Sequence, residues 1–204
     1  MLKLFSNCVA AIIFIVSPAF ACAAPPGGRD ISVHVERDGN AFAVAAELTV
    51  AASTDEVWDV LTDFDHMAQI LSNVDLSRVA NRTGTRFEVI QKAHGSVGPI
   101  HVSLDSVRAV ELTPKREIRS HLIKGDLKSA DFTTRIATKG GITRISVSGK
   151  IVAEGLSAGA ITPEAVQAQT QRQYQELREE ILRRKAKEPP RPCVLAKNCA
   201  QVSG

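Results

Sequence analysis

The sequence TPEAVQAQTQRQYQELREEILRRKAK occupies residues 162–187 and predicts one long helix. Thr162 stands directly before Pro163, and a polar N-cap residue followed by proline at the first helical position is a favoured helix start. Pro189 and Pro190 end the segment. Apolar and bulky side chains recur every three or four residues along one face: Val166, Thr170, Tyr174, Leu177 and Ile181. Such an amphipathic helix needs a broad apolar surface to lie on.

The preceding part of the chain predicts a sheet that can supply this surface. Apolar and polar residues alternate in successive short segments, which is the period of a half-buried strand. Lys139-Gly140-Gly141 joins two of these segments and is typical of a β-hairpin turn. Strands in hairpin succession indicate an antiparallel sheet with one covered face. The predicted strands are residues 31–35, 41–50, 76–80, 86–93, 100–111, 117–123, 130–138 and 143–153.

Two short helices are expected between the second and third strands. Ser53 and Glu56 have the spacing of a capping box, in which each side chain bonds the backbone N–H of the other residue. Val57, Trp58 and Leu61 follow at helical spacing, and a second helix is expected over residues 65–71. The chain therefore bends once before the run of hairpins begins.

The order of elements and the stretch TDEVWDVLTDF at Thr54–Phe64 resemble the polyketide cyclase/dehydrase and coenzyme Q-binding START-type family. That family belongs to the helix-grip (SRPBCC, START-like) superfamily, and the resemblance covers residues 42–187. It implies an α+β helix-grip fold. A curved antiparallel sheet of about six or seven strands would wrap around the long C-terminal helix, with two short helices after the first main strand. It also implies a hydrophobic cavity between sheet and helix.

The first residues have the features of a secretory signal. Lys3 precedes an apolar run at residues 9–16, and Ala19-Phe20-Ala21 forms an A-x-A cleavage pattern. We expect cleavage near Ala21 and a periplasmic or secreted protein. An uncleaved anchor and lipidation of Cys22, which would tether the domain to a membrane, are the alternatives. The expected divisions are a signal peptide at 1–21, a linker at 22–30, the START-like domain at 31–187 and a C-terminal tail at 188–204.

Cysteine use is consistent with export. Cys193 and Cys199 lie close together in the tail and could form a local disulfide in an oxidising compartment. A zinc site is not expected, because no second pair of ligands accompanies them. No cofactor is indicated either.

The charge balance argues against nucleic acid as a partner. Removal of the signal takes away Lys3 and no acidic residue, which leaves 24 basic and 22 acidic residues, whereas a nucleic-acid binder should present a concentrated basic face. The basic stretch at residues 183–187 closes the long helix, where cations face the negative end of the helix dipole. We interpret it as a solvated helix end, with a transient contact to an anionic membrane as the alternative, and we expect a monomer.

No catalytic constellation is visible in the sequence. The histidines lack the HxxxH and HExxH spacings of metal sites, and no G-x-S-x-G or G-x-G-x-x-G motif is present. Two residues are weak catalytic candidates. Asp63 is either a general base at the helix junction or the cap of the second short helix, and Tyr174 either offers its hydroxyl to a ligand or packs in the core.

Composition bears on the cavity. A curved sheet around a helix encloses volume that Ala, Val and Ser fill poorly, although a compact core of Val, Ile and Leu is the alternative. An empty lumen of about 200 Å³ costs about 5 kcal/mol, a large part of a net stability of about 5–15 kcal/mol, so a real lumen suggests an occupant. The aromatic residues after the signal are few: Phe42, Trp58, Phe64, Phe87, Phe132 and Tyr174.

The leading hypothesis is an exported carrier or binding protein for a hydrophobic small molecule, such as a lipid, an isoprenoid quinone or a polyketide-like ring compound. A cyclase or dehydratase that uses Asp63 or Tyr174 is the alternative from the enzyme class, and a non-catalytic envelope interaction module is the third. Candidate ligand-binding residues are Trp58, Phe64, Val89, Val102, Leu104, Ile118, Leu122, Phe132, Ile136, Tyr174 and Leu177.

Overall fold

The computed structural model describes residues 30–97, 100–154 and 161–187, with the backbone alone at residues 96, 97 and 100–102. The predicted signal peptide, Cys22 and the tail with Cys193 and Cys199 lie outside the described residues. Export and the tail disulfide therefore stay predictions. Within the described ranges, no helix is both long and apolar enough to cross a membrane.

The described residues form one antiparallel sheet of eight strands, in the spatial order β1-β2-β8-β7-β6-β5-β4-β3. The sheet is larger than the six or seven strands expected, because β1 pairs with β2 along its whole length, from Ile31 opposite Leu48 to Asp38 opposite Ala41. The strands are β1 (Ile31–Asp38), β2 (Ala41–Val50), β3 (Val74–Thr83), β4 (Arg86–Val97), β5 (Ile100–Thr113), β6 (Glu117–Gly125), β7 (Ser129–Lys139) and β8 (Ile142–Val152).

The β7–β8 connection shows how local sequence sets the pairing. Lys139 lies opposite Ile142, so only Gly140 and Gly141 form the loop. Both glycines have positive φ, 60° and 78°, the backbone conformation that a two-residue turn of this hand requires. The predicted hairpin is confirmed.

Alternation along the strands decides which side chains face the interior. On β2 the buried residues alternate with exposed or half-buried ones. On β4 and β6 the buried positions include Val89, Ile118 and Leu122, on the faces predicted from the sequence. The buried residues of β2 are Phe42, Val44, Ala46, Leu48 and Val50.

The short helices follow β2 as predicted. In α1 (Thr54–Leu61) both capping-box bonds are present: the Ser53 N–H donates to Glu56 Oε2 at 2.6 Å, and the Glu56 N–H donates to Ser53 Oγ at 3.3 Å. The second helical segment is divided into a 3-10 turn, η1 (Phe64–His66), and α2 (Met67–Ile70). These elements place Val57, Val60 and Leu61 over one end of the sheet.

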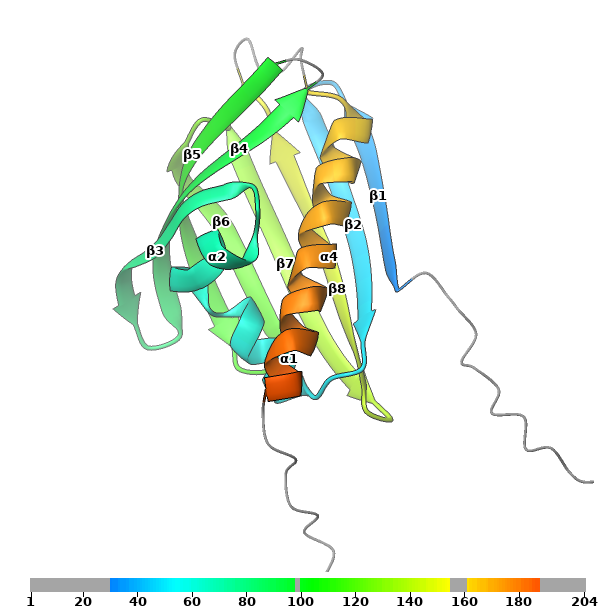
Figure 1. The fold of residues 1–204 in the computed structure, drawn as a ribbon. Coiled ribbons are helices and arrows are strands. Elements are labelled where there is room, and N and C mark those ends of the chain that lie inside the picture. Colours follow the sequence, from blue (N-terminus) through cyan, green and yellow to red (C-terminus); the bar gives the residue numbers. More distant parts are fainter. Residues whose placement is uncertain (1–29, 98–99, 155–160, 188–204) are drawn as a thin grey trace, which may run out of the picture.

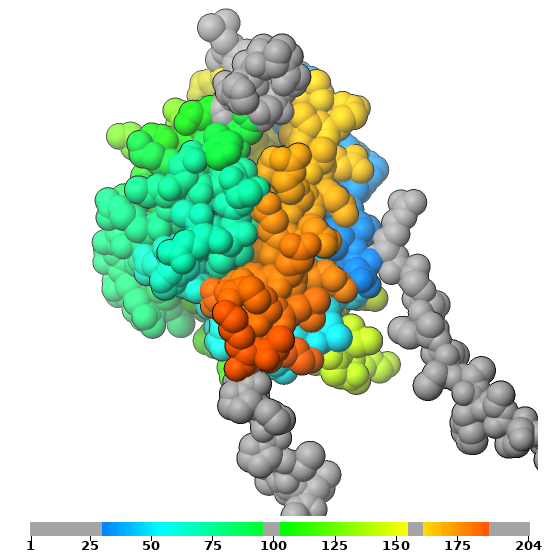
Figure 2. Space-filling view, viewed as in Figure 1, coloured from blue at the N-terminus to red at the C-terminus, as the bar shows by residue number. Residues whose placement is uncertain are grey.

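The long helix α4 (Pro163–Lys187) begins at the predicted proline, and Thr162 Oγ1 accepts a hydrogen bond from the Ala165 N–H at 3.2 Å. It lies across the concave face of the curved sheet (Figure 1). In the space-filling view α4 lies between β1 on one side and α2 and β3 on the other (Figure 2). β1 and β3 are the two edge strands of the sheet. The helix therefore closes the curved sheet, as the helix-grip expectation requires.

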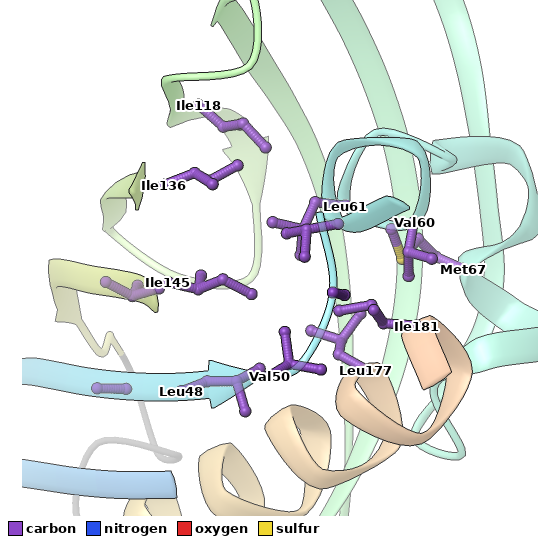
Figure 3. Close-up of a cluster of buried hydrophobic side chains, with 14 of the residues drawn as sticks. Leu48, Val50, Val60, Leu61, Met67, Ile118, Ile136, Ile145, Leu177 and Ile181 are labelled. Carbon is purple, nitrogen blue, oxygen red and sulfur yellow. The ribbon is translucent and has the colours of Figure 1, made fainter. Parts of the chain in front are cut away.

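The two halves of α4 cover different interiors. Under the C-terminal half, residues 175–187, a dense hydrophobic cluster fills the space, and Ile181 is fully buried (Figure 3). No residue of the N-terminal half, residues 163–174, is fully buried. We call these regions the packed half and the hollow half of the interior. The labelled members of the cluster in Figure 3 are Leu48, Val50, Val60, Leu61, Met67, Ile118, Ile136, Ile145, Leu177 and Ile181.

Candidate ligand-binding cavity

A cavity of about 640 Å³ lies between the N-terminal half of α4 and the inner faces of β2, β4, β5, β7 and β8. Its volume is within the range of about 300–1,000 Å³ that is typical of small-molecule sites. Most of its wall is apolar. The apolar residues that line it are Phe42, Val44, Ala93, Leu104, Leu127, Phe132, Ile151, Ile161, Ala165, Val166 and Ala168.

Small residues on the helix and on the sheet contribute to the cavity. α4 presents Ala165 and Ala168 in the hollow half, where the packed half presents Leu177 and Ile181. On the opposite wall β4 contributes Ala93 and Gly95. Beside larger lining residues such as Phe42, Leu104 and Phe132, these small residues leave space between helix and sheet, in agreement with the cavity expected from composition.

The mouth of the cavity lies between α4 and the segment that leads into β3. Ser72, His94, Ala168 and Arg172 line the cavity and are exposed, so solvent reaches it on this side. Two hydrogen-bonded bridges join α4 to this segment. The Ser72 N–H donates to Glu176 Oε2 at 3.0 Å, and Gln173 Nε2 donates to Asn73 Oδ1 at 3.0 Å.

A stack of three residues forms the wall at β5, β7 and β8. Phe132 lies directly over Gly149: a Cβ atom at position 149 would be 2.2 Å from Phe132 Cδ1. The guanidinium carbon of Arg108 lies 5.6 Å from the centroid of the Phe132 ring, and Arg108 Nε donates to Ser120 Oγ at 2.6 Å. Burial lowers the pKa of Arg108 below that of a free guanidinium, and the charge of Asp131 partly offsets this effect. A guanidinium nevertheless stays protonated in proteins, so the wall carries a positive charge.

α4 contributes polar groups to the same cavity. Burial raises the pKa of the Tyr174 hydroxyl, which therefore stays protonated and acts as a hydrogen-bond donor at neutral pH. Gln169 Nε2 is buried and has no hydrogen-bond partner among the described residues. Both residues line the cavity.

Three of the predicted ligand-binding residues line this cavity: Leu104, Phe132 and Tyr174. Leu122 is buried on β6 and is not part of the cavity wall. Val102 lies on β5 at a position where the structure describes the backbone alone. The others belong to the packed half or pack against it, namely Trp58, Phe64, Val89, Ile118, Ile136 and Leu177. Strand alternation predicted the inward face, but the position along each strand depends on which half of α4 lies above it.

Asp63 lies away from the cavity wall, in a charged pocket formed with the C-terminal half of α4. It stands at the N-cap position of η1, but its side chain makes no capping hydrogen bond. Its carboxylate instead bonds His66 Nδ1 at 2.6 Å and Arg184 at 2.7 Å. Burial raises its pKa, and the hydrogen bonds from His66 and Arg184 outweigh that effect and hold the pKa below its ordinary value. The capping interpretation is therefore wrong, because two cationic or polar side chains compete successfully for the carboxylate.

Sequence patterns did not predict that Arg108 and Gln169 line the cavity or that Asn73 and Gln173 form a bridge at its mouth. A signal for Arg108 was present, since it follows Leu104 and Ser106 at alternating positions of the same strand. A cation on the inward face of a strand is unusual, because Arg is rarely buried without a partner. Gln169 carried no comparable signal, since it belongs to a run of polar helix residues.

The fold and the cavity define an α+β domain of the helix-grip type. Residues 41–181 match the family described as polyketide cyclase / dehydrase and lipid transport. This chain belongs to that family, as the resemblance at Thr54–Phe64 implied. No curated protein matches it.

Solved structures share the fold at low sequence identity. A STAR-related lipid transfer protein from Xanthomonas axonopodis aligns with a TM-score of 0.62 and 16% identity, over 76% of this chain and 95% of that one. A protein from Thermus thermophilus aligns with a TM-score of 0.60 and 20% identity, over 70% and 98%. The Zhui aromatase/cyclase from a Streptomyces species aligns with a TM-score of 0.54 and 19% identity, over 72% and 94%. These likenesses show the START-like fold.

Proposed function

We propose that this chain is an exported carrier or binding protein that holds a hydrophobic small molecule in the cavity under the N-terminal half of α4. The observation that carries the proposal is the cavity of about 640 Å³ with a largely apolar wall. A lipid, an isoprenoid quinone or a polyketide-like ring compound is the proposed class of ligand. The family description, which includes lipid transport, supports this class.

The cavity also bears on the two alternatives. An interaction module needs no hollow interior, whereas this domain keeps one at the expense of core packing. A cyclase or dehydratase would need an acid–base group within the cavity. His94 lines it only at the exposed mouth, where its Nδ1 lies 2.9 Å from Asp75 Oδ1. Asp63 does not line it. Tyr174 does line it, but as a group that stays protonated. We therefore favour binding over catalysis.

The test is to fill the cavity and measure binding of a neutral fluorescent probe, N-phenyl-1-naphthylamine. Ala165 lines the cavity, so Ala165→Trp should weaken probe binding at least about tenfold by occupying the site. Ala186 is exposed near the end of the same helix, so Ala186→Trp is the matched control and should bind like the wild type.

Probe binding that is absent in the wild type, or equal in the two variants, would refute binding in this cavity. Circular dichroism of both variants checks that α4 remains folded. Mass spectrometry of the apolar extract from the purified protein then identifies a natural occupant. For export, comparison of periplasmic and membrane fractions of the wild type and Cys22→Ala separates a soluble protein from a lipid-anchored one.

A further inference from the structure

We propose that Arg108 binds an anionic oxygen group of the ligand, so that the preferred ligand is an amphipathic organic acid with its apolar body along the cavity wall. This inference rests on the proposed function and adds the chemical class of the ligand's polar group. It follows from the contacts of one side chain and from the absence of a counter-charge beside it among the described residues.

Arg108 enters the cavity from the inner face of β5. Its same-face neighbours on the strand are Ser106 and Val110, of which Val110 is buried, and Leu104, beyond Ser106, lines the cavity. Val89 is its neighbour on β4 and Leu122 is its neighbour on β6, and both are buried. Arg108 is therefore flanked by buried apolar residues on three sides and by Ser106 on the fourth, and it lines the cavity.

The interactions of Arg108 within the protein leave its binding capacity largely unused. Its Nε donates to Ser120 Oγ, and its planar group lies over the Phe132 ring. Neither partner carries a negative charge. Among the described residues, no acceptor bonds its two terminal nitrogens, and no carboxylate lies within ion-pair distance of it. A guanidinium has five N–H donors, so four of them remain available in the cavity.

The nearest opposite charge is already engaged. Asp131 influences Arg108 only through space, and its carboxylate bonds His121. Asp131 precedes the inward-facing Phe132 on β7, and His121 follows the inward-facing Ser120 on β6. Both Asp131 and His121 are exposed. Burial of an unpaired cation is unfavourable, so a protein that retains one in a binding cavity gains from a ligand that brings the counter-charge.

Two other polar groups of the cavity are also hydrogen-bond donors without an acceptor among the described residues. Gln169 Nε2 is a buried donor without a described partner, and the Tyr174 hydroxyl makes no hydrogen bond to a described residue. The amide oxygen of Asn73, by contrast, already accepts from Gln173. The cavity thus offers unused donors to a ligand rich in acceptor oxygens. A guanidinium can bind a carboxylate or a phosphate through two parallel hydrogen bonds, which makes Arg108 the strongest of these donors.

The experiment compares ligands that share an apolar body and differ in the polar group: laurate, dodecyl phosphate and dodecanol. Each displaces N-phenyl-1-naphthylamine from the wild type, Arg108→Met and Arg144→Met. Wild type should bind laurate or dodecyl phosphate at least about tenfold more tightly than dodecanol. The preferred acid identifies which anionic group the site takes.

Arg108→Met should lose this preference and keep its affinity for the neutral probe within about twofold, because methionine retains the apolar stem. Arg144 is exposed on β8 and does not line the cavity, so Arg144→Met should keep the preference. Equal binding of acid and alcohol by the wild type, or a preference that survives in Arg108→Met, overturns the inference and leaves the carrier function standing. Failure of the neutral probe to bind at all overturns the proposed function instead.

Arg108→Lys separates charge from geometry. Lysine keeps the positive charge but cannot form two parallel hydrogen bonds, so this variant should show an intermediate preference for the acid. A preference for the acid in Arg108→Lys as strong as in the wild type would count against two parallel hydrogen bonds to the ligand. Thermal unfolding of all three variants verifies that each is folded.

Discussion

At the scale of single residues, the wall of the cavity depends on the contact between Gly149 and Phe132. Phe132 pairs with Gly149 across β7 and β8, and its ring occupies the space that a side chain at position 149 would take. The ring in turn lies beneath the guanidinium of Arg108. A glycine in the middle of a strand costs conformational entropy, and here the close approach of an aromatic ring explains its presence.

Gly149→Ala should therefore destabilise the domain by about 1–3 kcal/mol, because the new methyl group overlaps both Phe132 and the Asp131 carbonyl oxygen. Gly95→Ala is the matched control. Gly95 also lies on a strand in the cavity wall, but an added Cβ would meet nothing within 4 Å, so its stability should change by less than about 0.5 kcal/mol. Urea unfolding measures both. An equal loss in the two variants would contradict the proposed contact.

At the scale of elements, α4 is attached differently at its two ends. Near its C-terminus, Arg184 bonds both Glu180 on its own helix, at 2.6 Å, and Asp63 at the start of η1, at 2.7 Å. Lys185 Nζ also donates to the Ala51 carbonyl oxygen. Along the middle of the helix, Glu176 and Gln173 bond the segment that leads into β3. These contacts hold the helix over the packed half while its first turns cover the cavity.

The charged cluster predicts a dependence of stability on pH. Hydrogen bonds from Arg183, and secondarily from Arg184, lower the pKa of Glu180 from 4.5 to about 2. Because the folded state has the lower pKa, the unfolded state binds more protons between these values. The stabilisation is therefore fully present above about pH 4.5 and is lost as the pH falls toward 2.

Glu180→Gln should reduce stability at pH 7 by about 1–2 kcal/mol, after allowance for solvent near Arg183, and should unfold with a weaker pH dependence between pH 5 and 2. Glu179→Gln is the control, since Glu179 is exposed and bonds only Gln175 among the described residues. Urea unfolding at a series of pH values provides the measurement. A slope unchanged by Glu180→Gln would refute the role of this carboxylate.

At the scale of the whole molecule, one curved sheet and one helix enclose two different interiors. In the packed half, side chains from β2, β6, β7, β8, α1 and α4 converge on one cluster (Figure 3). In the hollow half, the same sheet and the same helix leave a cavity of about 640 Å³.

This division predicts unequal costs for the same substitution. Ile181 is fully buried in the packed half, so Ile181→Ala should cost about 2–5 kcal/mol of unfolding free energy. Ile151 lines the cavity, is only half-buried and packs against a smaller cluster that includes Phe42 and Val44, so Ile151→Ala removes fewer contacts and should cost about 1 kcal/mol. Urea unfolding of the two variants without ligand tests the contrast. Similar costs at both positions would mean that the hollow half contributes to stability like a filled core.

Most of the fold was predictable from residue patterns of short range. The capping box at Ser53 and Glu56, the glycine pair at 140–141 and the Thr162-Pro163 helix start all appear where the pattern placed them. Each depends on contacts within a few residues, for which local sequence is sufficient. The candidate site was predictable only in part. Strand alternation placed Leu104 and Phe132 inside, the apolar stripe of the long helix placed Tyr174 there, and the scarcity of aromatic side chains suggested a lumen.

The sequence by itself determined the strands, the helices and the side of each that turns inward, because periods of two and of 3.6 residues are local properties. Only the tertiary structure decided which inward residues meet large partners and which meet small ones. It set Ile181 in the packed cluster, brought Ala165, Ala168, Ala93 and Gly95 to the wall of one cavity, and placed Arg108 in that wall without a counter-charge from the described residues. Such pairings join residues distant in the chain, and they follow from how the helix crosses the curved sheet rather than from any local pattern.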